Sequence, residues 1–186
     1  MKKFELTTEF ITNALGKKLF RIKALVEFGS VKAGELGGYA EKEENISQDG
    51  NAWVSGDARV YGNAWVSGDA RVYGDAWVHG NAKVFGNAEV YGDTEVSGDA
   101  KVSDNAEVSG DADYALVKGF GAEFRCTTFY RDKNKKIMVN CGCFHGDLEA
   151  FRKQVKETRS GKIAKEYLMI ADLMEYHFTS EGSNNE

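Results

Sequence analysis

A strict six-residue period between residues 51 and 113 constrains this chain more than any other feature. The unit is Gly-(Asn/Asp)-Ala-x-Val-x, repeated without insertion or deletion and with few substitutions. Alanine and valine lie two residues apart, so in extended backbone they point to one side and the residue between them points to the other. Glycine with Asn or Asp tolerates left-handed backbone and turns the chain. The repeat therefore predicts a solenoid of short strands and corners, with Ala and Val inside.

The order Val-x-Gly-Asp-Ala-x resembles the hexapeptide repeat of left-handed parallel β-helices, in which a small residue follows an aliphatic one by four positions, as Ala58 follows Val54. The resemblance implies a three-sided prism with about eighteen residues per coil. In that family the glycine often follows the aliphatic residue directly, whereas here one residue intervenes. We predict an all-β solenoid, a left-handed parallel β-helix over residues 31–113, with a β lead-in over residues 1–30 and an α+β cap of ββαα order over residues 114–186.

The segments on either side of the repeat also resemble known sequences, those of uncharacterised β-helix proteins of bacteriophages and prophages. The resemblance rests on residues 3–7, 19–25, 36–39 and 141–149. It implies a phage-type, cytoplasmic protein and implies no reaction.

Patterns within these segments predict local structure. Alternating apolar and polar residues in the lead-in predict a hairpin that turns at residues 13–16 and plugs or flanks the first coil. In the cap, Asp147 is the expected N-cap of a helix that carries Leu148, Phe151 and Val155 on one face.

Charge and cysteine content limit the possible partners. The net charge of −5 is uneven, with −8 in residues 47–113. A protein that grips a phosphate backbone normally carries a basic stripe, so this repeat argues against duplex nucleic acid. No long apolar run predicts a membrane span, and no leader pattern predicts secretion. Three cysteines, an odd number, favour reduced thiols and a cytoplasmic location.

Large rings occupy outward positions of the repeat, and we take them as candidate contacts for a ligand or for other subunits. The tryptophans are twelve residues apart and so fall on three faces, and eighteen residues per coil place Tyr73 beneath Tyr91. A belt of rings is buried in a homo-oligomer, most simply a trimer, or under the lead-in, or it stacks against a nucleotide. The belt consists of Trp53, Tyr61, Trp65, Tyr73, Trp77, Phe85 and Tyr91.

A second candidate set lies in the cap. Cys141, Cys143 and His145 alternate, so one strand could present all three on one face, and a hairpin turning at residues 133–134 would set Cys126 opposite Cys141. Three cysteines and a histidine form a known structural zinc set, although this spacing is not a standard one. The alternative is that these cysteines are small buried apolar residues.

Catalysis is not the function that the sequence favours, and no catalytic residue or cofactor is predicted. Nothing in the sequence sets an acid beside His79 or His177, as a cysteine-histidine nucleophile pair would need. Many left-handed β-helix proteins are acyltransferases that use coenzyme A, and that resemblance implies a histidine, for which His79 is the candidate. Their histidine usually lies near a loop thrown out of the prism, and this repeat has none.

The sequence therefore favours a non-catalytic binding or oligomeric scaffold protein of phage type. One form of this hypothesis is a counter-defence protein that binds a host immune protein or sequesters a small nucleotide signal. The alternative is an acyltransferase that uses acyl-coenzyme A.

Overall fold

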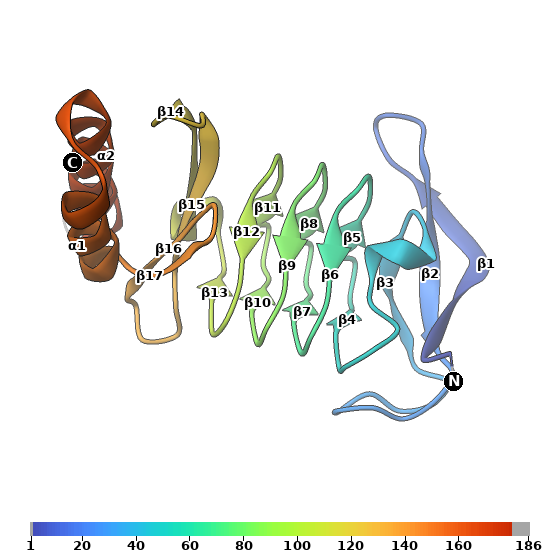
Figure 1. Ribbon diagram of the computed structural model, residues 1–186. Helices are drawn as coiled ribbons and strands as arrows, with labels where there is room; N and C mark the ends of the chain where they lie inside the picture. Colours follow the sequence, from blue (N-terminus) through green and yellow to red (C-terminus); the bar gives the residue numbers. More distant parts are fainter. Residues whose placement is uncertain (1, 180–186) are drawn as a thin grey trace, which may run out of the picture. The chain divides into compact units, whose positions relative to one another are not determined.

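The computed structural model describes residues 2–179, and the chain divides into two compact units, Met1–Asp111 and Ala112–Glu186. The first unit contains a β-helix and the lead-in, and the second contains a sheet with two helices (Figure 1).

The repeat forms ten two-residue strands separated by corners (Figure 1). Strands one coil apart pair in parallel with Cα partners eighteen residues apart, as Trp53 pairs with Arg71, so the expected coil length is confirmed. The strands are β4 (Trp53–Val54), β5 (Arg59–Val60), β6 (Trp65–Val66), β7 (Arg71–Val72), β8 (Trp77–Val78), β9 (Lys83–Val84), β10 (Glu89–Val90), β11 (Glu95–Val96), β12 (Lys101–Val102) and β13 (Glu107–Val108).

Three sheets form the sides of a prism of about four coils, the left-handed parallel β-helix that the repeat predicts. Face 1 consists of β4, β7, β10 and β13, face 2 contains β5, β8 and β11, and face 3 consists of β6, β9 and β12. These names are kept below.

The interior of the prism is apolar because each coil places its alanine and valine inward. The repeat valines from Val54 to Val108 have no exposed surface. Thr94, which replaces an alanine, is also fully buried, and its hydroxyl donates to the carbonyl of Tyr91 at 2.7 Å. Burial of an unpaired hydroxyl is costly, so this local bond is what allows a threonine there.

The lead-in extends one side of the prism. Strands β1 (Phe4–Thr12) and β2 (Lys18–Ala24) form the expected antiparallel hairpin, and β3 (Leu36–Ala40) pairs antiparallel with β2 and parallel with β5. Face 2 thus continues as a sheet of order β1-β2-β3-β5-β8-β11. A short helical turn η1 (Glu43–Asn45) follows β3. The hairpin pairs a strand edge that a solenoid end would otherwise leave open.

The second unit is an antiparallel sheet of consecutive strands β14 (Tyr114–Phe120), β15 (Arg125–Arg131), β16 (Ile137–Cys141) and β17 (Phe144–Asp147), followed by two helices. The helices are α1 (Leu148–Thr158) and α2 (Gly161–Thr179), and η2 (Asp111–Asp113) precedes β14.

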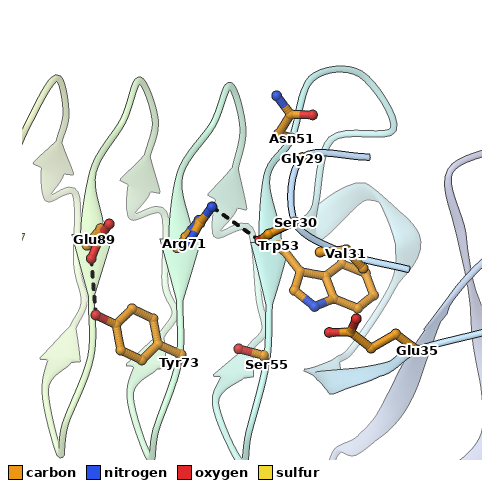
Figure 2. A pocket seen from close by; sticks show the side chains of 10 residues that line it. All are labelled: Gly29, Ser30, Val31, Glu35, Asn51, Trp53, Ser55, Arg71, Tyr73 and Glu89. Atoms are coloured by element: carbon orange, nitrogen blue, oxygen red, sulfur yellow. Dashed lines mark hydrogen bonds between the residues drawn. The ribbon is translucent and has the colours of Figure 1, made fainter. Parts of the chain in front are cut away.

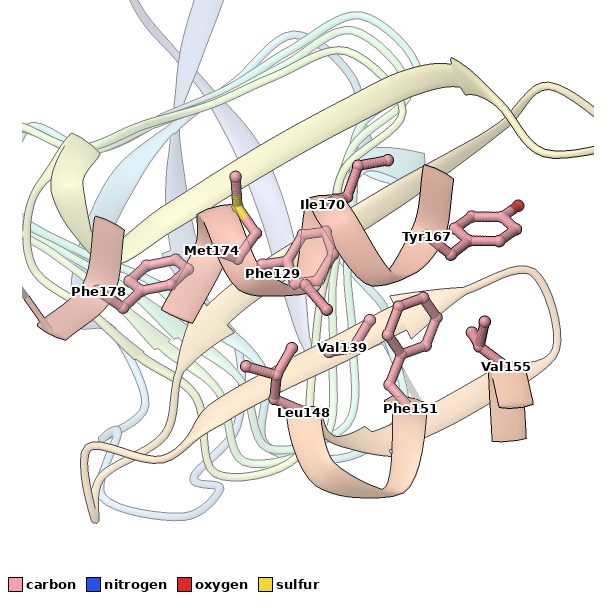
Figure 3. Packing of buried hydrophobic residues seen from close by; sticks show 10 residues of the cluster. Phe129, Val139, Leu148, Phe151, Val155, Tyr167, Ile170, Met174 and Phe178 are labelled. Atoms are coloured by element: carbon pink, nitrogen blue, oxygen red, sulfur yellow. The ribbon is translucent and has the colours of Figure 1, made fainter. Parts of the chain in front are cut away.

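Helix α1 begins as the sequence predicts. The Asp147 side chain accepts a hydrogen bond from the backbone of Ala150, and Leu148, Phe151 and Val155 are buried. Figure 3 shows these three beside residues of α2 and of strands β15 and β16 in one apolar cluster. The sheet has four strands and not the two of the expected ββαα order: β14 pairs with the β15–β16 hairpin on one side, and a reversal at Gly142, whose φ is 64°, adds β17 on the other.

Candidate functional site

The structure corrects the expectation that all seven aromatic residues form an exposed belt. Trp65 is 40% exposed, but Trp53 and Tyr61 are only 6% and 8% exposed. The lead-in covers both: the rings of Phe4 and Phe28 meet Trp53 edge-on at centroid distances of 6.5 and 5.4 Å. Tyr61 is buried in a small cluster with Leu19 and Tyr39. The alternative reading, burial under the lead-in, therefore holds for these two rings.

The other rings lie half-buried along the faces of the prism. Tyr73 stacks on Tyr91 as expected, with ring centroids 4.9 Å apart and planes 3° from parallel. The guanidinium of Arg59 lies over the ring of Trp77 at 4.9 Å. Phe85 is half-buried on the side of face 3.

A groove of about 290 Å³ lies where the segment before β3 passes over face 1. Figure 2 shows the indole of Trp53 beside Ser30 and Val31, with Tyr73 and Glu89 further along the face. Three successive strands of face 1 contribute the side chains of Trp53, Arg71 and Glu89. The groove is lined by Gly29, Ser30, Val31, Glu35, Asn51, Trp53, Ser55, Arg71, Tyr73 and Glu89.

The residues that line the groove include one charged and one neutral hydrogen-bond donor, the Arg71 guanidinium and the Trp53 indole. The indole nitrogen of Trp53 is buried and has no hydrogen-bond partner among the described residues. An Arg71 guanidinium nitrogen donates to the Ser30 hydroxyl at 3.3 Å, which links the prism to the segment above it (Figure 2). A buried donor without an acceptor costs about 1–3 kcal/mol, so the Trp53 nitrogen is an unfavourable feature of the packing between the prism and the lead-in.

Two carboxylates also line the groove. The Tyr73 hydroxyl donates to a Glu89 carboxylate oxygen at 3.1 Å (Figure 2). Burial, followed by the hydrogen bond to Glu89, raises the pKa of Tyr73 to about 12. Glu35, from the segment before β3, adds a second carboxylate to the lining. The groove can therefore offer a cation and an anion to one small polar molecule.

The structure corrects the prediction that no acid lies beside His79. Its Nε2 is 2.8 Å from a Glu95 carboxylate oxygen, and its ring stacks on Tyr61 with centroids 4.8 Å apart. The same diagonal contact, over sixteen residues, joins Tyr91 to Glu107 at 2.8 Å. The contact arises because Val78 pairs with Val96 of the next coil, so His79, which follows Val78, lies diagonally opposite Glu95, which precedes Val96. The contact between His79 and Glu95 was predictable from the eighteen-residue coil length, but the sequence pattern alone had not indicated it.

The proposed cysteine and histidine set is not brought together. Thr127, and not Cys126, pairs with Cys141, because the loop between β15 and β16 has five residues and shifts the register by one position. The turn at Gly142 then places Cys143 outside both strands. Among the described residues, no group of three or more His, Cys, Asp or Glu side chains could hold a metal ion.

The cysteines take separate environments instead. Cys126 and Cys141 are half-buried, whereas Cys143 is exposed. The Cys141 sulfur accepts a hydrogen bond from the Thr127 hydroxyl at 3.1 Å. Cys141 and Cys143 both line a cavity of about 70 Å³ in the second unit, together with Tyr167.

These features define a class of protein: the chain is a parallel β-helix, or β-solenoid, protein. A family model described as the YdcK beta solenoid repeat matches residues 52–68 and 64–80, which span β4 to β8. No curated protein shows significant sequence similarity to the chain. Among the described residues, no helix has the length and apolar character needed to cross a membrane.

Proposed function

We propose that this protein is a non-catalytic binding protein whose β-helix presents a ligand groove on face 1. The observation that carries the proposal is the exposed guanidinium of Arg71 in a groove that also contains the Tyr73 ring and the Glu89 carboxylate. A guanidinium binds an anionic ligand group through charge-assisted hydrogen bonds.

The lining favours a small polar molecule with an aromatic part. Arg71 would take an anionic group, Glu35 and Glu89 would accept from hydroxyl or amino groups, and the Tyr73 ring would contact a planar base. A nucleotide combines these groups. The volume of about 290 Å³ is at the lower end of small-molecule sites, which run from roughly 300 to 1,000 Å³.

A specific form of this proposal is a phage-type counter-defence protein that sequesters a small nucleotide signal or occupies a host immune protein. Two observations support it. Residues 3–7, 19–25 and 141–149 resemble phage β-helix proteins, and stacked rings and a guanidinium lie on the prism.

Tryptophan fluorescence can test the proposal directly, because the chain has three tryptophans and one of them lines the groove. In a Trp65→Phe, Trp77→Phe background the emission reports on Trp53 alone. We expect nucleoside monophosphates or cyclic dinucleotides to change this emission and to release heat in calorimetry. Arg71→Gln should abolish both signals. Arg59→Gln, the same change at the same position of the repeat on face 2, should preserve them.

The proposal fails if none of these probes alters the emission or the heat at millimolar concentration and native mass spectrometry of the purified protein finds no bound small molecule. Retention of binding by Arg71→Gln would instead show that ligand binds elsewhere.

A second candidate function is acyl transfer from acyl-coenzyme A, and the His79–Glu95 contact favours it. A carboxylate 2.8 Å from Nε2 could hold the imidazole in one orientation, as a general base requires. The pair lies on a regular coil and does not line the groove. Acyl-coenzyme A turnover that is lost in His79→Ala and in Glu95→Gln would establish this function over the first.

A further inference from the structure

In the later coils of the prism, the outward side chains of two faces have opposite charge. On face 3 the outward residues of β6, β9 and β12 are Trp65, Lys83 and Lys101. On face 1 those of β10 and β13 are Glu89 and Glu107. A protein whose repeat is acidic therefore carries one face with a cationic column, next to an acidic one.

The two columns have the same spacing. Lys83 pairs with Lys101, and Glu89 pairs with Glu107, in adjacent parallel strands. Each step is thus the strand separation of about 4.8 Å. Lys83 and Glu89 are six residues apart, a third of a coil, so their levels along the prism differ by only about 1.6 Å.

We propose that face 3 of one copy of this chain docks on face 1 of a second copy, with the two prism axes parallel and pointing the same way. At matched levels this arrangement sets Lys83 against Glu89 and Lys101 against Glu107. One coil earlier it sets Trp65 against Arg71, a cation–π pair. Antiparallel axes would keep the ion pairs but would lose the Trp65–Arg71 contact.

The shape and order of the two surfaces fit this docking. Trp65 is the large exposed apolar group on face 3, and it borders a shallow hollow of about 310 Å³ with Lys83. On face 1, Tyr73 and Tyr91 donate to Glu89 and Glu107 and so hold both carboxylates in place before docking. Preorganised side chains lose less entropy on association.

A second copy explains the surfaces better than an unrelated partner, because the complementary columns occur on one chain with one repeat distance. The contact uses two different faces and is therefore heterologous, so it closes into a ring or extends as a filament. The docking does not rest on ligand binding, but Arg71 and Glu89 of face 1 also line the groove, so a bound ligand and a second copy would compete for that face.

Charge reversal combined with light scattering tests the docking. The full-length protein should be oligomeric, while K83E/K101E and E89K/E107K should each raise the dissociation constant roughly 30-fold, because each replaces two exposed ion pairs by two like-charge contacts. The variant that carries all four changes restores opposite charges and should reassemble. Glu95→Lys, at the same repeat position on face 2, should leave the mass unchanged.

A monomeric wild-type protein at high micromolar concentration would overturn the inference. So would reversal variants that keep the wild-type mass, or a four-fold variant that stays monomeric although circular dichroism shows it folded. Strong weakening of the wild-type oligomer by Glu95→Lys would mean that face 2 forms the contact instead.

Discussion

Gly50→Ala tests how closely adjacent coils of the β-helix approach each other at a corner. Gly50 has a φ of 70°, and a Cβ built there lies 2.5 Å from the carbonyl oxygen of Gly68 in the next coil. That oxygen accepts the backbone N–H of Asn51 at 2.8 Å, so it cannot move without loss of a bond that closes the coil.

The magnitude follows from two separable costs. Left-handed backbone costs an L-residue about 1–2 kcal/mol, and a rigid overlap adds about 1–3 kcal/mol. The reduced entropy of the unfolded chain returns roughly 0.4–1 kcal/mol. We expect Gly50→Ala to lower the free energy of unfolding of the first unit by about 2–4 kcal/mol.

Gly16→Ala is the matched control, because Gly16 has a φ of 77° but its Cβ would meet no atom within 4 Å. It should cost only about 0.5–1 kcal/mol, the left-handed strain less the entropy term. Urea unfolding followed by tryptophan emission reports on the β-helix, since the chain's three tryptophans lie in β4, β6 and β8. Equal losses in the two variants, with unchanged m-values, would refute the argument that close approach between coils makes this corner intolerant.

Three further predictions concern pH and helix capping. Burial lowers the pKa of Lys3 to about 8, so the unfolded chain binds the extra proton between pH 8 and 10.5; stability should rise with pH there, and Lys3→Met should remove that rise in urea titrations. Burial, with the bond to Glu89, raises the pKa of Tyr73 to about 12, so stability is lost as pH increases from 10 to 12; Tyr73→Phe should flatten this decline, whereas an unchanged slope would contradict the raised pKa. Asp147→Ala removes the N-cap of α1 and should destabilise the second unit by about 1 kcal/mol, measured by loss of helical circular dichroism, while Asp147→Asn should retain most of it.

The sequence predicted the elements that depend on a local period. Eighteen residues per coil, buried Ala and Val, and the Tyr73–Tyr91 stack all follow from one repeat applied along the chain. The N-cap at Asp147 was equally predictable, because capping requires only neighbouring residues.

The candidate site was only half predictable. Trp53 could be placed on face 1 from its position in the repeat, but its burial depends on Phe4 and Phe28, which approach from a segment outside the period. The cysteine set failed for a related reason, since one extra loop residue between β15 and β16 moves Cys126 to the opposite side of its strand relative to Cys141.

The sequence by itself determined the prism. Every six residues repeat an Ala and a Val on one side of the backbone, and burial of these apolar side chains away from water is favourable. Only the tertiary structure decided which outward groups form a site. The segment before β3 covers Trp53 and leaves Trp65 exposed, and a five-residue loop sets the register between β15 and β16. Both depend on contacts between residues far apart in the chain, which no repeat encodes.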